Sequence, residues 1–524
     1  MPVRSPYPDV EIPDVSLYDF LFTGFGEKAG DPALIDGSTG ASITFGELEG
    51  MVNKIAAALA ERGIGAGDVV GLFAPNSPHY VAVFHGILRA NAVVTSINSL
   101  YTPGELAHQL SDSGARLLFT ISPFLDRALA AAAEVGLPAE KIVVLDGAEG
   151  HESLADLLST TAQPPAQTVT SGDTAVLPYS SGTTGRAKGV MLTHRNLVAN
   201  LQQIAAMGEV DDGTRILAVL PFFHIYGMTV MMNQGLHRRA TVVTMPRFDL
   251  QEFLRVISEY RVSRIYIAPP VAVALAKHPI VDQYDLSCID VIFSGAAPLD
   301  AELGHAVAKR LGCTVLQGYG MTELSPVSHS MPDDRPDLDL NSCGFAIPNI
   351  TCKIVDPETG EEVGPGVPGE LWVKGPNVMA GYLNNPEATA ATLDDEGYLH
   401  TGDVATVTED GVFTIVDRVK ELIKYKGYQV PPAELEALLL THEKIADAAV
   451  IGVRDAEGEE VPKAFVVRQE GASDLTEEDV MTFVAERIAP HKKVRVVEFI
   501  DQIPKSASGK ILRKDLRARE QARA

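Results

Sequence analysis

The residues best suited to chemistry lie in a run of small polar residues, Ser180 to Gly185, which follows an apolar stretch. The run precedes Lys188 and a predicted helix with Thr193 as its cap. Glycines in such a run leave backbone N–H groups accessible and tolerate positive φ, while the hydroxyls and the lysine add donors and positive charge. This combination predicts a phosphate-binding loop. The lysine does not follow a glycine at the spacing of a Walker loop, so the predicted cradle is of another kind. Taken alone, the run could also be a mobile surface loop.

The elements that must position this loop are predicted by short apolar runs that alternate with amphipathic stretches. Residues 69–75 are expected to form a buried strand, and residues 77–93 a helix with a Ser-Pro start. Further strand candidates are residues 92–98, 115–121, 141–147, 215–221, 240–246, 264–270 and 291–298. Alternation of strands and helices on this scale predicts an α/β fold, with mostly parallel sheets covered by helices on both faces.

The pattern changes after about residue 345, where strands punctuated by Gly and Pro predict a β-rich subdomain. A smaller α+β unit is expected to begin near Val419, with a helix over 431–440, and to end in a basic tail. Residues 420–524 hold 18 basic and 19 acidic residues, whereas the whole chain has a net charge of −26. The small unit is therefore far less acidic than the rest, as a cap that meets phosphates would need.

Composition excludes several classes of function. The negative charge repels nucleic-acid backbones and anionic lipid, so neither nucleic acid nor a membrane surface is an expected partner. No apolar run approaches the length of a spanning helix, and the amino terminus lacks the apolar segment of a signal peptide. Four cysteines without a CxxC pair predict reduced thiols rather than a zinc site. A soluble protein of the cytoplasm that binds small molecules is the resulting expectation.

The stretch SSGTTGRAKGVMLTH (180–194) resembles the phosphate loop of the adenylate-forming superfamily, which includes acyl-CoA and aryl-CoA synthetases, beetle luciferases and nonribosomal adenylation domains. Six companion segments follow in the family's order across about 330 residues. They are PFFHIYG (221–227), FSGAAPL (293–299), QGYGMTE (317–323), YLHTGD (398–403), IVDRVKELIKYKGYQVPPAELE (415–436) and PKSASGKILRK (504–514). One departure is Arg186-Ala187, which replaces the usual apolar-Pro pair before the lysine.

The resemblance implies an enzyme that activates a carboxylate with ATP. Attack of the carboxylate on the α-phosphate gives a mixed anhydride and pyrophosphate, so the site must first neutralise negative charge. Matching positions for ATP or AMP are Ser180, Ser181, Gly182, Thr183, Thr184, Lys188, Gln317, Gly318, Thr322, Asp403, Arg418 and Lys420. Glu323 matches the magnesium ligand of the family, and Asp403 the residue that bonds both ribose hydroxyls.

The family also implies a second half-reaction, in which the small domain rotates and the acyl group passes to coenzyme A. The implied division is a large domain over 1–416 with its β-rich subdomain at about 345–416, a hinge over 417–420 with Lys420 as pivot, and a small mobile domain over 421–524. Lys510 matches the lysine of adenylation, and Lys424 and Gln429 match the thioester-forming face. His224 matches the gate to the thiol tunnel, and Arg247, Lys426 and Gly427 match positions along coenzyme A.

The acid pocket implied by matching positions contains Tyr226, Val230, Ala296, Gly320, Pro326, Val327 and Ser330, with Gln317 and Gly318 beside them. Small residues at 296, 318 and 320 predict a flat slot for an aryl ring. Tyr226 could stack on that ring or form a hydrogen bond with a ring hydroxyl. The hinge segment looks most like that of 4-coumarate:CoA ligases. The prediction is therefore an acid–thiol ligase, monomeric or homodimeric, that uses ATP, Mg²⁺ and coenzyme A on cinnamate or 4-coumarate.

Other functions stay open at this point. Small pocket residues could equally admit an alkyl chain, so a medium-chain fatty acyl-CoA synthetase is the main alternative. An amino-acid-activating domain, a luciferase and a nucleotide sensor without catalysis are further candidates. The presence of both Lys424 and Lys510 argues against the sensor.

Overall fold

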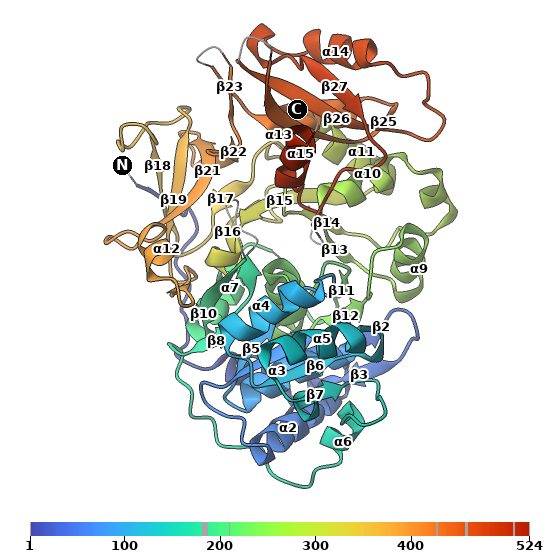
Figure 1. Cartoon of the computed structure of the whole chain (residues 1–524), viewed down its shortest axis with the longest axis vertical. Coiled ribbons are helices and arrows are strands. Elements are labelled where there is room, and N and C mark those ends of the chain that lie inside the picture. Colours follow the sequence, from blue (N-terminus) through green and yellow to red (C-terminus); the bar gives the residue numbers. More distant parts are fainter. Residues whose placement is uncertain are drawn as a thin grey trace.

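The computed structural model describes residues 2–180, 187–208, 210–425, 428–455, 459–506 and 509–522. These residues form a large unit, whose last strand ends at Arg418, and a small unit that begins with a strand at Ile423. In Figure 1 the small unit lies above the large one. Its apolar side chains pack into clusters of their own, in which the described residues all come from Ile423 onward. Each unit therefore has its own hydrophobic core.

One sheet of the large unit has a parallel centre, in the order β8-β5-β4-β6-β7. Its strands are β4 (Val69–Phe73), β5 (Val93–Ser96), β6 (Leu117–Thr120), β7 (Ile142–Val144), β8 (Thr174–Val176), β9 (Tyr179–Ser180), β10 (Lys188–Thr193) and β20 (Gly381–Tyr382). Helices α2 (Phe45–Glu61), α3 (Pro78–Arg89), α4 (Pro103–Ser113) and α5 (Leu125–Val135) belong to this part. Helix α3 contacts both this sheet and β2 of the next, so it lies between the two sheets and is apolar on nearly all sides.

The second sheet joins a parallel half to an antiparallel half. Its order is β1-β18-β19-β21-β22-β17-β16-β15-β14-β13-β11-β12-β2-β3, and the strands from β15 to β2 run parallel. The parallel strands are β2 (Pro32–Asp36), β11 (Arg215–Ala218), β12 (Thr241–Thr244), β13 (Arg264–Ile267), β14 (Val291–Ser294) and β15 (Thr314–Gly320). The antiparallel strands are β1 (Val3–Arg4), β3 (Ser42–Thr44), β16 (Val327–Ser330), β17 (Gly344–Ala346), β18 (Thr351–Val355), β19 (Gly369–Lys374), β21 (Leu399–Val407) and β22 (Val412–Arg418). The β-rich part after residue 345 thus continues the hydrogen bonding of the parallel sheet.

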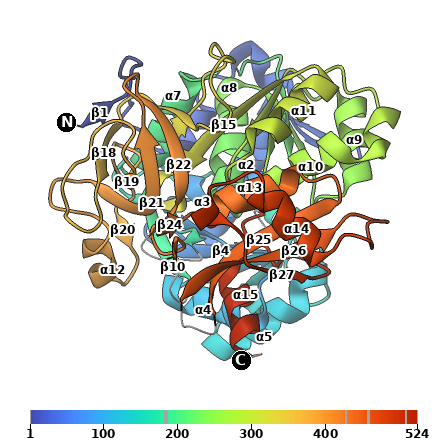
Figure 2. The ribbon, with the colours of Figure 1, turned by 90° about the horizontal axis from the view of Figure 1, so that it is seen from above.

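Helices between these strands cover the second sheet, as Figure 2 shows for α9, α10 and α11. They are α7 (His194–Ala205), α8 (Gln234–Arg238), α9 (Leu250–Tyr260), α10 (Pro269–Lys277) and α11 (Ala301–Leu311). Shorter elements are α1 (Leu17–Phe22), α6 (Leu154–Leu158), α12 (Pro386–Ala390), a π-helix over Gly227–Asn233 and a 3-10 turn over Thr322–Leu324. The predicted α/β class, with a large N-terminal and a small C-terminal part, is confirmed.

The small unit contains a hairpin, a three-stranded sheet and helices on its faces. Its elements are β23 (Ile423–Tyr425), β24 (Tyr428–Val430), α13 (Pro432–Thr441), β25 (Ile445–Arg454), β26 (Glu460–Arg468), α14 (Glu477–Ala485), β27 (Val496–Phe499) and α15 (Arg513–Gln521). The basic tail expected from the sequence is a helix rather than a loose end. Leu516 of α15 is buried with Phe465 and Ile503, which holds the tail on the sheet.

Side-chain caps determine where several helices begin. Thr193, the cap predicted from the sequence, accepts the N–H of Asn196 at 3.1 Å, and the Asn196 side chain accepts the N–H of Thr193 at 2.9 Å. Since β10 runs directly into this cap, α7 holds the strand on which Lys188 lies. None of the helices in the described part of the chain is long and apolar enough to cross a bilayer.

Candidate active site

The predicted motifs meet at the carboxyl ends of neighbouring parallel strands. β11, β13, β14 and β15 lie side by side in the sheet. The chain that follows them carries His224, Ala268, Ala296 and Glu323 in turn. In open α/β sheets this edge is where ligands bind, because the loops after parallel strands surround one crevice. Motifs that lie about 100 residues apart in the sequence therefore converge.

The predicted phosphate side of the crevice is organised around Glu323. This residue is 5% exposed, and one carboxylate oxygen, Oε1, accepts the hydroxyl of Ser180 at 3.1 Å and that of Tyr382 at 2.9 Å. The Lys188 ammonium lies 4.5 Å from the centre of the Tyr382 ring. Thr322, one of the predicted nucleotide-binding residues, is partly exposed beside Glu323. The remaining predicted loop residues, Ser181, Gly182, Thr183 and Thr184, lie outside the described residues.

Glu323 suits a magnesium ion. Mg²⁺ commonly takes one or two protein carboxylates and completes its octahedron with water and phosphate oxygens. The two hydroxyls orient Glu323 through one oxygen, so the second oxygen can serve as the metal ligand. Glu323 would hold the ion beside Lys188, where both positive charges meet the phosphates.

The predicted ribose side is built around Asp403. One carboxylate oxygen accepts the Tyr319 hydroxyl at 2.5 Å, and the other lies 3.2 Å from Nε of Arg418. Asp403 and Arg418 face each other across the β21–β22 ladder, which brings them together without any long loop. Burial, followed by the charge of Asp403, raises the pKa of Tyr319, so the phenol keeps its proton and donates it to the carboxylate. Asp403 is thus a hydrogen-bond acceptor oriented from both of its oxygens.

Lys510 of the small unit enters this crevice. Burial and then the charge of Arg418 lower its pKa to about 8, against the opposing influence of Asp403 and Glu323. The preceding Gly509 has φ +85°, and a Cβ there would lie 3.1 Å from the Cβ of Ala268. Only glycine allows this close approach with this backbone. The backbone just before Lys510 therefore lies against the start of α10.

The acid side begins at His224. Burial, followed by the charge of Lys510, lowers the pKa of His224 to about 4, so its ring is neutral at pH 7. Its Nδ1 accepts the N–H of Tyr226 at 3.3 Å, which fixes the ring. Tyr226 is buried; its hydroxyl donates to the carbonyl of Phe293 at 3.4 Å, and its ring meets Tyr266 edge-on. An uncharged imidazole beside an ammonium suits a boundary between a charged and an apolar compartment.

The other predicted pocket residues divide into lining and support. Ala296 is exposed and has φ 70°, while Val230 is buried in the π-helix. The side-chain amide of Gln317 donates to the carbonyls of Leu299 and Leu340 and accepts the N–H of Leu299, so it holds the loop that carries Ala296. Gln317 therefore supports the pocket through its neighbours.

Gly318 and Gly320 do not provide the open slot that their size suggests. A Cβ at Gly318 would lie 2.9 Å from the Phe293 ring, and one at Gly320 would collide with the carbonyl of Pro326. Their missing side chains leave room for the protein's own atoms. Ser330 lies opposite Gly318 and donates to the carbonyl of Met331, and the carbonyl of Val327 accepts two buried asparagine amides. Close strand packing, rather than a free cavity, explains the small residues here.

Several predicted residues lie away from the crevice. Lys424 is exposed on the β23–β24 hairpin, where its N–H donates to Glu460, and Lys420 is exposed just after β22. Arg247 is exposed in the turn between β12 and α9. Gln429 is placed only as a backbone position of β24, and Lys426 and Gly427 lie outside the described residues. The structure thus brings Lys510 into the site while Lys424 remains at the surface.

Two tyrosines complete the site although the sequence reasoning did not select them. Tyr319 lies inside the QGYGMTE segment, so its place in that motif was a usable signal. Tyr382 has no such signal, because the chain reaches Glu323 from a short strand about 60 residues further on. Both act by orienting a carboxylate that the motifs did identify.

Comparison with known proteins agrees with this geometry. The model of the AMP-binding enzyme family matches residues 24–383, and that of the AMP-binding enzyme C-terminal domain matches residues 434–510. The 4-coumarate–CoA ligase of Pinus taeda is 43% identical over 98% of this chain and 97% of its own. The anthranilate CoA ligase AuaEII in complex with anthranoyl-AMP superposes with a TM-score of 0.90 at 27% identity, covering 98% of each chain. ATP-bound MatB from Rhodopseudomonas palustris superposes with a TM-score of 0.86 at 30% identity, covering 97% of this chain and 99% of its own.

The fold and the site define an enzyme that activates carboxylates by adenylation. The chain belongs to the AMP-binding enzyme family. The predicted family, the acid–thiol ligase class and the use of ATP, Mg²⁺ and coenzyme A are confirmed.

The Tyr319 hydroxyl can be tested by removal. Tyr319→Phe should raise KM for ATP about tenfold and change kcat less than about twofold, because it removes a hydrogen bond to a charged group that orients Asp403 for binding. Pyrophosphate release measured against ATP concentration gives both constants. Tyr398→Phe, which alters a buried tyrosine of the β-rich subdomain, is the control and should leave KM unchanged. Equal changes in the two variants would contradict the assignment.

The lowered pKa of Lys510 predicts a pH dependence. The ammonium is the form that pairs with anions, so kcat/KM for pyrophosphate release should fall as the pH rises through about 8, up to tenfold per pH unit. Arginine stays protonated throughout this range. The slower Lys510→Arg variant should therefore show a flat profile between about pH 7.5 and 9.5. A decline of the same steepness in that variant would show that another group titrates.

Proposed function

We propose that this enzyme forms the coenzyme A thioester of a phenylpropenoic acid, cinnamate or 4-coumarate, in two half-reactions at one crevice. The observation that supports this most strongly is the insertion of Lys510 between the phosphate side, the ribose side and His224. The relatives whose names specify 4-coumarate match the chain over nearly its whole length. Location in the cytoplasm and a monomeric or homodimeric state remain part of the proposal. The four free cysteines are compatible with a reducing compartment.

In the first half-reaction, a carboxylate oxygen of the acid attacks the α-phosphorus of ATP and pyrophosphate leaves. Lys188 and Lys510 oppose the negative charge of the phosphates, and Asp403, oriented by Tyr319, holds the ribose. Glu323 would hold Mg²⁺, which would add positive charge beside the leaving pyrophosphate. Lys510 stands where it can contact both the acid and the α-phosphate, since it faces His224 on one side and Arg418 on the other. Such preorganised charge is commonly a large term in catalysis.

In the second half-reaction, the sulfur of coenzyme A attacks the acyl carbon, the bond to AMP breaks, and the thiol proton is released. Lys510 has no role in that step, and Lys424 is the lysine proposed to act in it. Because Lys424 is exposed at the hairpin, the small unit has to rotate before this lysine reaches the crevice. We place the pivot at Lys420.

The contacts around Lys420 support a short hinge. Arg418 is the last residue of β22, and the N–H of Val419 still donates to the carbonyl of Gly402 at 2.9 Å. The next contacts are those of a turn, since the N–H of Glu421 donates to the carbonyl of Arg418. Asp417 and Arg418 belong to the sheet, so within the predicted 417–420 segment we propose the turn after Arg418 as the place of rotation.

The apolar surface of the proposed acid pocket favours an aromatic substrate, whereas the existing hydrogen bonds of its hydroxyls limit how they could bind a ring hydroxyl. Tyr226 and Val230 are buried and Ala296 is exposed, so the proposed pocket would be apolar at its deep end and open at its mouth. The Tyr226 hydroxyl donates to Phe293, so toward a ring hydroxyl it would act as the acceptor. Ser330 is already bonded to Met331, which makes it a weaker candidate for that contact.

The substrate is tested by pyrophosphate release over cinnamate, 4-coumarate, caffeate, benzoate, octanoate and palmitate, each with and without coenzyme A. The proposal requires the highest kcat/KM for a phenylpropenoate and a thioester product only with coenzyme A. Preference for octanoate would instead assign a medium-chain fatty acyl-CoA synthetase. If none of these acids supports pyrophosphate release, both candidate functions are excluded.

The two lysines should separate the half-reactions. Lys510→Ala should slow acyl-adenylate formation about 10²–10⁴-fold and leave thioester formation from supplied acyl-adenylate nearly unchanged, as expected when one positioned charge is removed. Lys424→Ala should show the reverse pattern. Rapid-quench measurement of AMP-ester and thioester resolves the steps. Loss of the same half-reaction in both variants would contradict the two-conformation assignment.

A further inference from the structure

Helix α13 of the small unit is bonded at its carboxyl end by a lysine of the large unit. Lys277, the last residue of α10, donates its ammonium to the carbonyl of Leu440 at 2.8 Å and approaches those of His442 and Ile445 at 3.4 and 3.5 Å. The last carbonyls of a helix have no partner within the helix. Burial lowers the pKa of Lys277, so this ammonium has exchanged water for the helix end.

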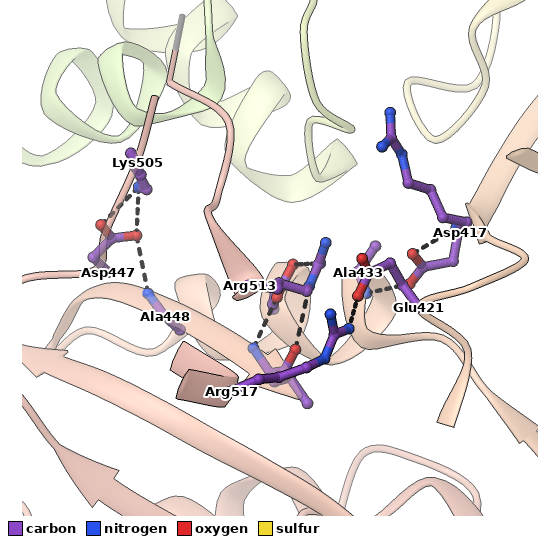
Figure 3. A network of polar contacts seen from close by, with 11 residues as sticks. Asp417, Glu421, Ala433, Asp447, Ala448, Lys505, Arg513 and Arg517 are labelled. Carbon is purple, nitrogen blue, oxygen red and sulfur yellow. Dashed lines mark hydrogen bonds and ion pairs between the residues drawn. The ribbon is translucent and has the colours of Figure 1, made fainter. Parts of the chain in front are cut away.

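The amino end of the same helix is capped from the large unit as well. Pro431, at the cap position, provides no side-chain bond, but the N–H of Ala433 donates to the Asp417 carboxylate at 2.9 Å. Asp417 lies in β22, and Figure 3 shows its carboxylate directed at Ala433. A carboxylate at the amino end and an ammonium at the carboxyl end both complement the helix dipole. α13 is thus held at its two ends by opposite charges.

A buried ion pair connects α13 to the segment that carries Lys510. Glu436 of α13 lies 2.6 Å from Arg513, which follows Lys510 by three residues. The other oxygen of Glu436 accepts the N–H of Val450 at 2.8 Å. Burial raises the pKa of Glu436 to about 7 although Arg513 opposes the shift. The orientation of α13 is thereby transmitted to the start of α15 and to the lysine before it.

The helix that carries Lys277 also touches the Lys510 loop. Gly509 lies against Ala268, the residue that directly precedes α10, and Lys277 is the last residue of α10. A helix of nine residues is about 13 Å long. α10 therefore supports the small unit at two separated points, one beside Lys510 and one beneath the end of α13.

We propose that Lys277 and Asp417 are positioning residues for adenylation, which hold the two ends of α13 and so keep Lys510 in the crevice. This inference rests on the proposed rotation at Lys420. Both residues precede that pivot and α13 follows it, so rotation breaks both contacts. Glu421–Arg517 and Asp447–Lys505, also shown in Figure 3, lie after the pivot and would turn with the small unit. The network thus contains contacts that depend on the conformation and contacts that do not.

The primary test is Lys277→Met, which keeps the length of the side chain and removes its charge. Acyl-adenylate formation should fall about tenfold, and thioester formation from supplied acyl-adenylate should stay within twofold or become faster. Lys444→Met removes a lysine that pairs with Asp474 inside the small unit, and should leave both rates unchanged. Equal loss of both half-reactions, no loss of either, or the same effect in the control would overturn the proposal.

Asp417 allows a second comparison across the pivot. Asp417→Ala should reduce acyl-adenylate formation selectively, and Asp417→Asn should restore part of it because the amide oxygen still accepts the N–H of Ala433. Glu421→Gln weakens a contact only four residues away that does not cross the pivot, and should affect both half-reactions alike or neither. A selective loss in Glu421→Gln, or none in Asp417→Ala, would contradict the role of Asp417.

A readout without activity separates this inference from the proposed function. Hydrogen exchange of the Ala433 amide and of the amides next to Leu440 should quicken at least severalfold in Lys277→Met, with the thermal midpoint of the large unit unchanged. If the wild-type enzyme activates none of the acids, the proposed function fails. The exchange result still tests whether Lys277 and Asp417 hold the ends of α13. If the wild-type enzyme is active but exchange in Lys277→Met is unchanged, only the role of the contacts at the ends of α13 is overturned.

Discussion

The structure depends on the placement of one partly dehydrated ammonium ion. Lys510 leaves water to stand between Arg418, which repels it, and Asp403 and Glu323, which attract it. Its lowered pKa shows that, without ligands, burial and repulsion outweigh attraction. Burial is the largest cause of that shift, followed by the charge of Arg418, and the negative charges of ATP and an organic acid would oppose both. Binding of the substrates relieves an unfavourable arrangement that the fold maintains beforehand, which is the form of electrostatic preorganisation expected of such an enzyme.

Maintaining that arrangement requires the small unit to be docked firmly yet reversibly. Its own core is separate from that of the large unit, so the docking does not depend on a shared apolar interior. The contacts that cross between the units include charged groups at the ends of α13 and a glycine against Ala268. Hydrogen bonds of this kind contribute modest free energies, because water replaces them when they break. Such an interface can hold one orientation and still permit another.

Much of the fold and of the site followed from local patterns. Alternating strands and helices indicated the parallel sheets, and Thr193 was recognisable as a cap because its chemistry is local. Motif positions identified Glu323, Asp403 and Lys510. The sequence could not reveal contacts between distant segments, such as the hydrogen bonds from Tyr382 to Glu323 and from Lys277 to the end of α13. Nor did it reveal that the basic tail forms a helix. The small residues Gly318 and Gly320 were misleading, since a missing side chain leaves room either for a ligand or for neighbouring backbone, and the tertiary structure decides which.

The central claim, that Lys510 occupies the nucleotide crevice while Lys424 faces solvent, can be measured by pulse labelling of lysines. A brief pulse of acetic anhydride at several pH values, followed by mass spectrometry, reports the reactivity of each lysine with and without ATP and magnesium. Lys510 should titrate with a pKa of about 8 and be protected severalfold by ATP, whereas labelling of Lys424 should be unaffected. Labelling of Lys510 at the rate of Lys424, with no protection by ATP, would contradict it.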